Sequence, residues 1–252
     1  MIIIKIGGSA ITDKSRPLSL DLEPVRGLAG LLRGLGEGLV LIHGGGSFAH
    51  PLAKAYGLGR GTRDEHQLIG VSLTTAALEA LNQALTIELA RRGVATYYVR
   101  AGDVFQMKRG QAFLANPGPI LGALSRGVAP LLHGDVVMDS ELGFSIISGD
   151  AIAEEITRLL SPRLVLFLMD VEGVYSEGAG KGALMRRLRR GDLIGVGGDA
   201  IDVTGGLMGK LRHAWNIAEM GPRTFMCSIK DLESIEAIIW GNDPPRCTEL
   251  IP

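Results

Sequence analysis

Six short runs of apolar and β-branched residues alternate along the chain with longer stretches of helical spacing. The runs lie at 2–6, 39–42, 95–99, 128–132, 164–169 and 223–227. They are apolar throughout rather than alternating, which is typical of strands buried on both faces. Strands that alternate with helices form a mainly parallel sheet covered by helices on both sides. The sequence therefore predicts an α/β fold, a three-layer αβα sandwich with a mainly parallel open sheet.

Longer segments between these runs predict the principal helices. The segment 65–92 has a wide, Ala-rich apolar stripe that lies either against the sheet or partly at a subunit contact. A second helix is expected between Ser148, a good N-cap residue, and Pro162. A third follows Gly206. The segments 136–138 and 144–147 flank a turn and predict a hairpin.

Length and charge limit the classes of protein that fit. A chain of 252 residues is enough for a single domain, with a soft seam near Ser161 that divides residues 1–161 from 162–252. A net charge of −1 creates no field that would recruit nucleic acid or an anionic membrane. Cys227 and Cys247 show neither metal-ligand spacing nor a disulfide framework, which favours a reducing compartment. We therefore expect a cytoplasmic protein.

Three glycine clusters follow predicted strands or open a predicted helix. They lie at 7–8, 44–46 and 205–206, and Lys5 and Lys210 are close to the first and the last. Glycines at a helix N-terminus expose backbone N–H groups to anions, although a single cluster could equally be a tight turn. Three clusters together favour phosphate binding. The chain lacks the Walker P-loop, the dinucleotide-binding spacing and the G-x-S-x-G motif of esterases.

These motifs, in this order, resemble the amino acid kinase superfamily. The resemblance rests on KIGGS at 5–9, GGG at 44–46, SGD at 148–150, FLMDVEGVYS at 167–176 and DVTGGLMGK at 202–210. It implies the acetylglutamate kinase-like fold. Residues 1–161 would form a lobe that binds the acceptor, and residues 162–252 a lobe that binds the nucleotide. KIGGSAITDK and GGGSFAH are most similar to the isopentenyl phosphate kinase branch. Fosfomycin kinase, another phosphonate or phosphate kinase, and a non-catalytic nucleotide- or anion-binding member remain the alternatives.

The resemblance also implies roles for individual residues and for small molecules. ATP would be the phosphoryl donor, with Mg²⁺ on the nucleotide. Because the sequence has no His, Cys, Asp or Glu cluster with metal-ligand spacing, we expect no dedicated metal cage of side chains. The chain would act as a homodimer in isoprenoid precursor synthesis by the mevalonate pathway, in an archaeon, without nucleic-acid or membrane partners. The implied catalytic residues are Lys5, Lys14, His50, Asp150 and Lys210. The implied nucleotide-binding residues are Lys5, Gly7, Gly8, Ser9, Asp170, Tyr175, Gly178, Lys181, Gly205, Gly206 and Lys210. Residues for the acceptor, including a candidate apolar wall for its tail, are Gly44, Gly45, Gly46, His50, Val71, Thr74, Leu131, Ile146 and Gly149.

Overall fold

A computed structural model describes residues 1–13, 15–35, 38–61, 64–177, 180–192 and 206–252. Its main sheet has eight strands in the order β10-β12-β11-β9-β1-β2-β6-β3. Neighbouring strands are parallel except for the β11–β12 pair. The strands are β1 (Ile2–Ile6), β2 (Leu39–His43), β3 (Thr96–Tyr98), β6 (Ala129–His133), β9 (Leu164–Met169), β10 (Arg187–Arg189), β11 (Arg223–Ser228) and β12 (Thr248–Ile251).

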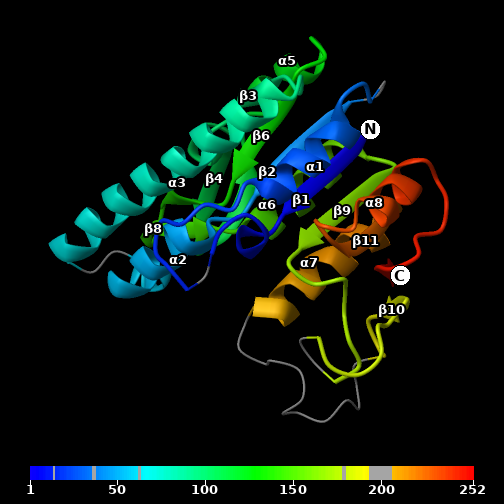
Figure 1. The fold of residues 1–252 in the computed structure, drawn as a ribbon. Helices are drawn as coiled ribbons and strands as arrows, with labels where there is room; N and C mark the ends of the chain where they lie inside the picture. The colour runs from blue at the N-terminus through cyan, green and yellow to red at the C-terminus, as the bar shows by residue number, and fades with distance from the viewer. Residues whose placement is uncertain (14, 36–37, 62–63, 178–179, 193–205) are drawn as a thin grey trace.

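Helices cover both faces of this sheet, so the predicted three-layer α/β architecture is confirmed. The helices are α1 (Glu23–Leu32), α2 (Gly46–Ala55), α3 (Glu65–Arg91), α4 (Ala101–Val104), α5 (Gly118–Leu124), α6 (Gly149–Leu160), α7 (Gly206–Glu219) and α8 (Leu232–Ile239), with 3-10 turns η1 (Gly8–Ala10) and η2 (Leu58–Arg60). Alternate strand residues enter two separate cores: Ile2, Ile4 and Ile6 pack with α1, α3 and α8 (Figure 1). Ile3 faces the opposite core with α6 and α7. Lys5 has the same parity as Ile3 and therefore points toward α6.

The main sheet runs without interruption across the predicted seam. Ser161 ends α6 in the left-handed conformation, with φ 44° and ψ 60°. The chain then enters β9, which lies between β1 and β11. Residues before and after the seam therefore share one sheet.

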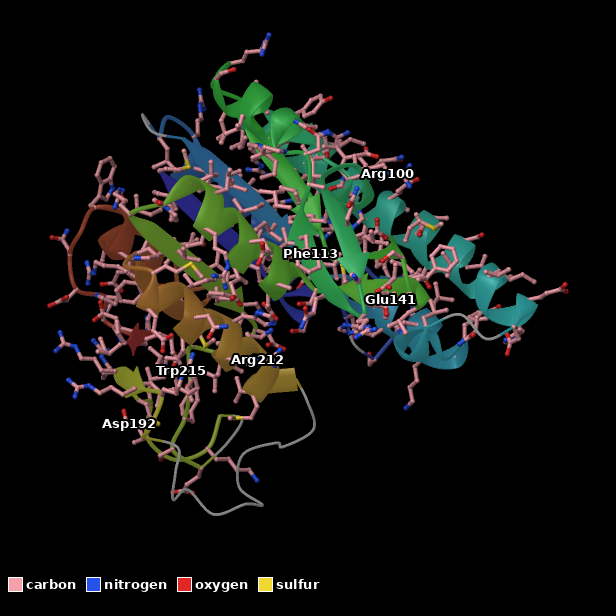
Figure 2. The ribbon with its side chains drawn as sticks, turned by 180° about the vertical axis from the view of Figure 1, so that it is seen from behind. Arg100, Phe113, Glu141, Asp192, Arg212 and Trp215 are labelled. Carbon is pink, nitrogen blue, oxygen red and sulfur yellow. A yellow bond between two sulfur atoms is a disulfide. The ribbon has the colours of Figure 1, made fainter. Side chains whose placement is uncertain are left out.

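A smaller sheet of four strands, ordered β5-β4-β7-β8, lies beside the α6 face. It comprises β4 (Phe105–Lys108), β5 (Gln111–Leu114), β7 (Asp135–Asp139) and β8 (Gly143–Ile147). The β7–β8 hairpin is the predicted one, whereas the β4–β5 hairpin was not expected. Figure 2 shows Phe113 on this sheet and Glu141 at the β7–β8 turn.

Asp139 joins the two hairpins of this smaller sheet. Its buried carboxylate accepts hydrogen bonds from the backbone amides of Arg109 and Gly110 in the β4–β5 turn, at 3.1 and 2.8 Å. It also accepts from the amides of Glu141 and Leu142 and from the Ser145 hydroxyl in its own hairpin. A single side chain thus fixes both turns relative to each other.

The cysteines differ from the sequence interpretation, because Cys227 and Cys247 form a disulfide with a Cα–Cα separation of 4.7 Å. Met226 lies opposite Thr248 in the antiparallel β11–β12 pair, so the next two positions face each other. Two cysteines 20 residues apart carry no motif that reveals this pairing, which depends on the strand register. The reducing compartment inferred from the cysteines loses its basis.

α3 is the longest of the described helices and carries apolar residues on both its buried and its exposed side. It satisfies a test for a membrane-spanning helix by length and composition alone. One side of α3, including Leu78, Leu81, Leu85 and Leu89, is buried in the molecule. The opposite side carries exposed Ile69, Leu73 and Ile87. Figure 1 shows this helix along one flank of the molecule.

Candidate active site

A cavity of about 650 Å³ opens where the parallel strands β1, β2, β6 and β9 end. Its lining includes the segments that follow these strands, at 7–9, 44–47, 134–136 and 170–171. The first turns of α2, α6 and α7 also line it, so three helix N-termini meet there. Open α/β sheets bind ligands at the carboxyl ends of their strands, and helix N-termini favour anions. The cavity is therefore suited to phosphate groups.

Two lysines share one carboxylate inside this cavity. Lys5 Nζ lies 2.6 Å from Asp150 Oδ1, and Lys210 Nζ lies 3.3 Å from Asp150 Oδ2. Asp150 is in the first turn of α6, where Ser148 caps the helix by accepting a hydrogen bond from the amide of Ala151 at 3.1 Å. The capping geometry thus holds the carboxylate between a strand lysine and an α7 lysine.

Burial and ion pairing shape the ionisation of this triad. Burial lowers the pKa of Lys5 to about 8, although Asp150 opposes the shift. Burial alone would raise the pKa of Asp150, but Lys5 and Lys210 outweigh that effect and hold its pKa at about 2. At neutral pH the carboxylate is charged, and Lys5 is mostly charged. The triad therefore carries a net positive charge that faces the cavity.

The glycines at 7–8 and 44–46 bring two loops into direct backbone contact. A Cβ at Gly8 would lie 2.1 Å from the nitrogen of Gly46, and one at Gly44 would lie 2.7 Å from the nitrogen of Gly8. Thr12 ties the same loops together, because its hydroxyl donates to the Gly8 carbonyl at 2.8 Å and accepts from the Ser47 amide at 3.0 Å. Glycine is therefore required at these positions for the two loops to pack against each other, independently of any ligand.

The same loops leave backbone donors for a ligand. Among the described residues, no acceptor is paired with the backbone amide of Gly8 or Gly45. Both residues line the cavity, at the ends of β1 and β2. Gly206 opens α7, and a Cβ there would meet nothing within 4 Å. Backbone amides that line the cavity without an acceptor, beside two lysines, form a suitable anion site.

One side of the cavity contains most of the residues expected for the acceptor and several others. His50 on α2, Thr74 on α3 and Ile146 on β8 line it with the glycines at 44–46 and 149. Thr74 is 2% exposed, and its hydroxyl has no partner within the described part of the chain. The wall that was predicted to be apolar therefore includes a hydroxyl group, that of Thr74, which is available to a ligand.

Two candidates for the acceptor wall do not line the cavity. Leu131 is buried in the core on the α3 face of the sheet, because side chains alternate along β6. Val71 on α3 is partly exposed and is likewise outside the lining. Sequence reasoning missed the lining residues Leu78, Asp135 and Val136. The position of Asp135 directly after the buried run 128–132 could have revealed it, and burial raises the pKa of this carboxyl.

The opposite side of the cavity includes Gly7, Gly8, Ser9, Asp170, Tyr175 and Gly206. The Tyr175 hydroxyl donates to Glu172 at 2.8 Å. Lys181 is exposed and is not part of the lining. Lys14, Gly178 and Gly205 lie outside the described residues. Within the described ranges, no three His, Cys, Asp or Glu side chains are grouped to hold a metal ion.

Comparison with known proteins identifies the family to which this site belongs. A profile of the amino acid kinase family matches residues 1–228. The chain belongs to the amino acid kinase family.

Among curated kinases, it is similar to isopentenyl phosphate kinase of Methanothermobacter thermautotrophicus, with 31% identity over 259 aligned residues that cover 96% of each chain. It is 32% identical to isopentenyl phosphate kinase of Thermoplasma acidophilum over 177 residues, 70% of each chain. An X-ray structure of isopentenyl phosphate kinase matches this amino acid kinase with a TM-score of 0.85 and 28% identity over 99% of each chain.

Proposed function

We propose that this amino acid kinase transfers the γ-phosphoryl group of ATP to isopentenyl phosphate, giving isopentenyl diphosphate and ADP. The observation that carries this proposal is the Lys5–Asp150–Lys210 triad in a cavity bounded by three helix N-termini. Two phosphate groups that meet in one site require positive charge and N–H donors more than they require a base. The triad and the glycine amides supply both.

The transfer itself needs no proton acceptor. An oxygen of the acceptor phosphate, which is largely dianionic near neutral pH, forms a bond to the γ-phosphorus. The bond between that phosphorus and the β–γ bridging oxygen breaks, and the bridging oxygen leaves with its electron pair on ADP. Lys5 and Lys210 would screen the transferred group, Lys14 would contact the γ-phosphate, and Asp150 would orient the two lysines. The amides of Gly8 and Gly45 would donate to phosphate oxygens as their charge shifts.

Assignment of the two sides of the cavity follows the resemblance. We infer that the residue 1–161 part holds the acceptor, with His50 donating to its phosphate and Thr74 and Ile146 beside its tail. The residue 162–252 part would hold the nucleotide, with Asp170 and Tyr175 toward the adenosine. Mg²⁺ would be held by the ATP phosphates and would neutralise their charge.

Isopentenyl phosphate is favoured over other acceptors because relatives that align with almost the whole chain are isopentenyl phosphate kinases. A fosfomycin or other phosphonate kinase would act on a smaller, more polar acceptor. A non-catalytic member would have no need for two lysines on one carboxylate. With this function, the protein would take part in isoprenoid precursor synthesis. We also propose that it acts in the cytoplasm.

We further propose a homodimer formed through α3. The α3 stripe consists of exposed Ile69, Leu73, Ala76, Ala80, Gln83, Ile87 and Ala90. Their spacing alternates between four and three residues, which is the seam of a helix pair. The order is symmetric about Leu78, so an antiparallel second copy would place Ile69 opposite Ile87 and Ala76 opposite Ala80.

Charges at the ends of α3 agree with this arrangement. Glu65 and Arg91 are both exposed and are also equidistant from Leu78. In the same antiparallel pair, each Glu65 would face the Arg91 of the other copy. Self-complementary contacts of this kind are those of a two-fold symmetric interface.

An ADP-release assay over a panel of phosphorylated acceptors tests the catalytic proposal. Isopentenyl phosphate should give the highest kcat/KM, fosfomycin should be poor, and chelation of divalent metal should abolish turnover until Mg²⁺ is restored. A preference for fosfomycin would identify the alternative kinase. Absence of ADP release with every acceptor on the panel would support the non-catalytic alternative.

A further inference from the structure

Below the catalytic triad, a second polar contact joins α6 to α7. Glu154 lies one turn after Asp150 on α6, and His213 lies one turn after Lys210 on α7. His213 Nδ1 is 2.7 Å from Glu154 Oε2. The Nδ2 atom of Asn216, a further turn along α7, lies 3.2 Å from each oxygen of the same carboxylate. The two helices are thus linked at successive turns by the Asp150–Lys210 and Glu154–His213 pairs.

Glu154 is an unusual residue to find between two helices. It is only 6% exposed, and burying a carboxylate costs free energy unless its oxygens are fully hydrogen-bonded. Burial alone would raise the pKa of Glu154, but the bonds from His213 and Asn216, together with Arg158, hold it below its usual value. The carboxylate therefore stays charged and binds two side chains of α7.

Apolar contacts already hold α7 in place, because Leu211, Ala214 and Ile217 are buried in the core beneath the sheet. Such contacts resist separation of the helices but tolerate small rotation and sliding. A buried, directional polar contact fixes the register of packed helices instead. Register matters here because Lys210 is on α7, and a displacement of about 1 Å in a catalytic group can cost about 100-fold in rate. Figure 2 shows Arg212 and Trp215 on this helix.

We propose that Glu154 and His213 form a positioning pair that sets the register of α7 on α6 and thereby places Lys210 for phosphoryl transfer. Neither residue is part of the cavity lining. The proposal rests on the role of Lys210 in the proposed function. Removing the pair should therefore affect kcat, through Lys210, far more than the KM of either substrate.

A double-mutant cycle with Lys210 tests the pair. His213→Ala should lower kcat by about 10- to 100-fold, with both KM values within about threefold of wild type. His213→Asn places an amide N–H donor near the position of the His213 Nδ1 atom and should recover most of the lost kcat. In the Lys210→Ala background, His213→Ala should change kcat by less than about twofold, because the lysine that it positions is gone.

Arg158→Ala is the matched control. Arg158 contacts the same Glu154 carboxylate, but it belongs to α6 itself and forms no link to α7 in this contact. The kcat of Arg158→Ala should remain near the wild-type value. A melting temperature is measured for every variant. Should His213→Ala fail to fold, His213→Leu keeps the volume without the donor and replaces it in the cycle.

The outcomes separate this proposal from the proposed function. A Lys210→Ala enzyme with normal kcat would show that the lysine has no role in transfer. A costly Lys210→Ala combined with a full, additive His213→Ala effect would overturn only the positioning pair. Equal kcat losses in Arg158→Ala and His213→Ala would also overturn it, since the effect would then arise from Glu154 alone.

Discussion

Lys5 combines two properties that rarely occur together in a lysine. It lies on a central strand, 4% exposed, and it is paired with a carboxylate that it shares with a second lysine. Burial moves its pKa down to about 8, which is close enough to neutrality for the charge to be lost within an accessible pH range. The proposed transfer requires the charged form.

We therefore expect kcat/KM for ATP to fall on the alkaline side with an apparent pKa of about 8. The sign follows from the lowered pKa: the charge is present below this value and lost above it. A pH–rate profile of the free enzyme measures the effect. Lys5→Arg, which cannot deprotonate in this range, serves as the control and should lack the alkaline limb whatever its absolute rate. An identical limb in that variant would assign the titration to another group.

At the same scale, His50 tests the proposed class of acceptor, because it lines the cavity. If it donates to the acceptor phosphate, His50→Ala should lower kcat/KM for isopentenyl phosphate by about 10- to 150-fold, since a hydrogen bond to a charged group contributes about 1.5–3 kcal/mol. ATP affinity, measured without acceptor, should not change. His50→Gln should lose less if its amide reaches the same oxygen.

A packing role for His50 would give the opposite result. Thermal stability would fall in His50→Ala while acceptor kinetics stayed intact. Measurement of both quantities on the one variant separates the two roles.

At the scale of elements, the smaller sheet depends on Asp139. Its five hydrogen bonds hold the β4–β5 and β7–β8 turns together, and β7 and β8 supply Val136 and Ile146 to the cavity. Burial opposes the charge, but the bonds from Ser145 and the turn amides outweigh it and hold the pKa of Asp139 far below its usual range.

Asp139→Asn should therefore reduce thermal stability in a pH-dependent way. A carboxyl group with a depressed folded-state pKa contributes stability above its unfolded pKa, about 3.9, and loses that contribution as the pH falls further. The difference in melting temperature between wild type and variant should be constant above about pH 5 and shrink below about pH 4. A difference that did not vary over this range would show that the charge of Asp139 is not responsible.

Sequence patterns were sufficient for the strands and helices that carry strong periodicity. The run at 2–6 and the helix after Ser148 occur where they were expected, because buried strands and a capped helix have local signatures. The β4–β5 hairpin and β12 are strands of four residues, too short for a periodic signal. The Cys227–Cys247 pair depends on strand register, which no local pattern records.

At the scale of the whole molecule, the α3 stripe predicts how two copies meet. Ala80→Glu would place a carboxylate at the centre of the proposed interface, opposite Ala76 of the second copy. The variant should sediment as a monomer of 26.7 kDa, whereas the wild type should have twice that mass. Gln106→Glu adds the same charge on an exposed strand of the smaller sheet and should leave the mass unchanged. A wild-type protein that is monomeric at all concentrations would rule out the interface.

The backbone contact between the loops at 7–8 and 44–46 has a consequence for how such an enzyme changes over evolutionary time. Because Gly8 and Gly46 touch main chain to main chain, the spacing between the donor and acceptor phosphates would be fixed by atoms that no substitution can vary without adding a side chain there. The proposed wall for the acceptor tail, by contrast, consists of exchangeable side chains on α3 and β8 that line the cavity. Acceptor preference can therefore drift by replacing those side chains while the reacting groups keep their distance, so one catalytic frame can be inherited by kinases with different substrates.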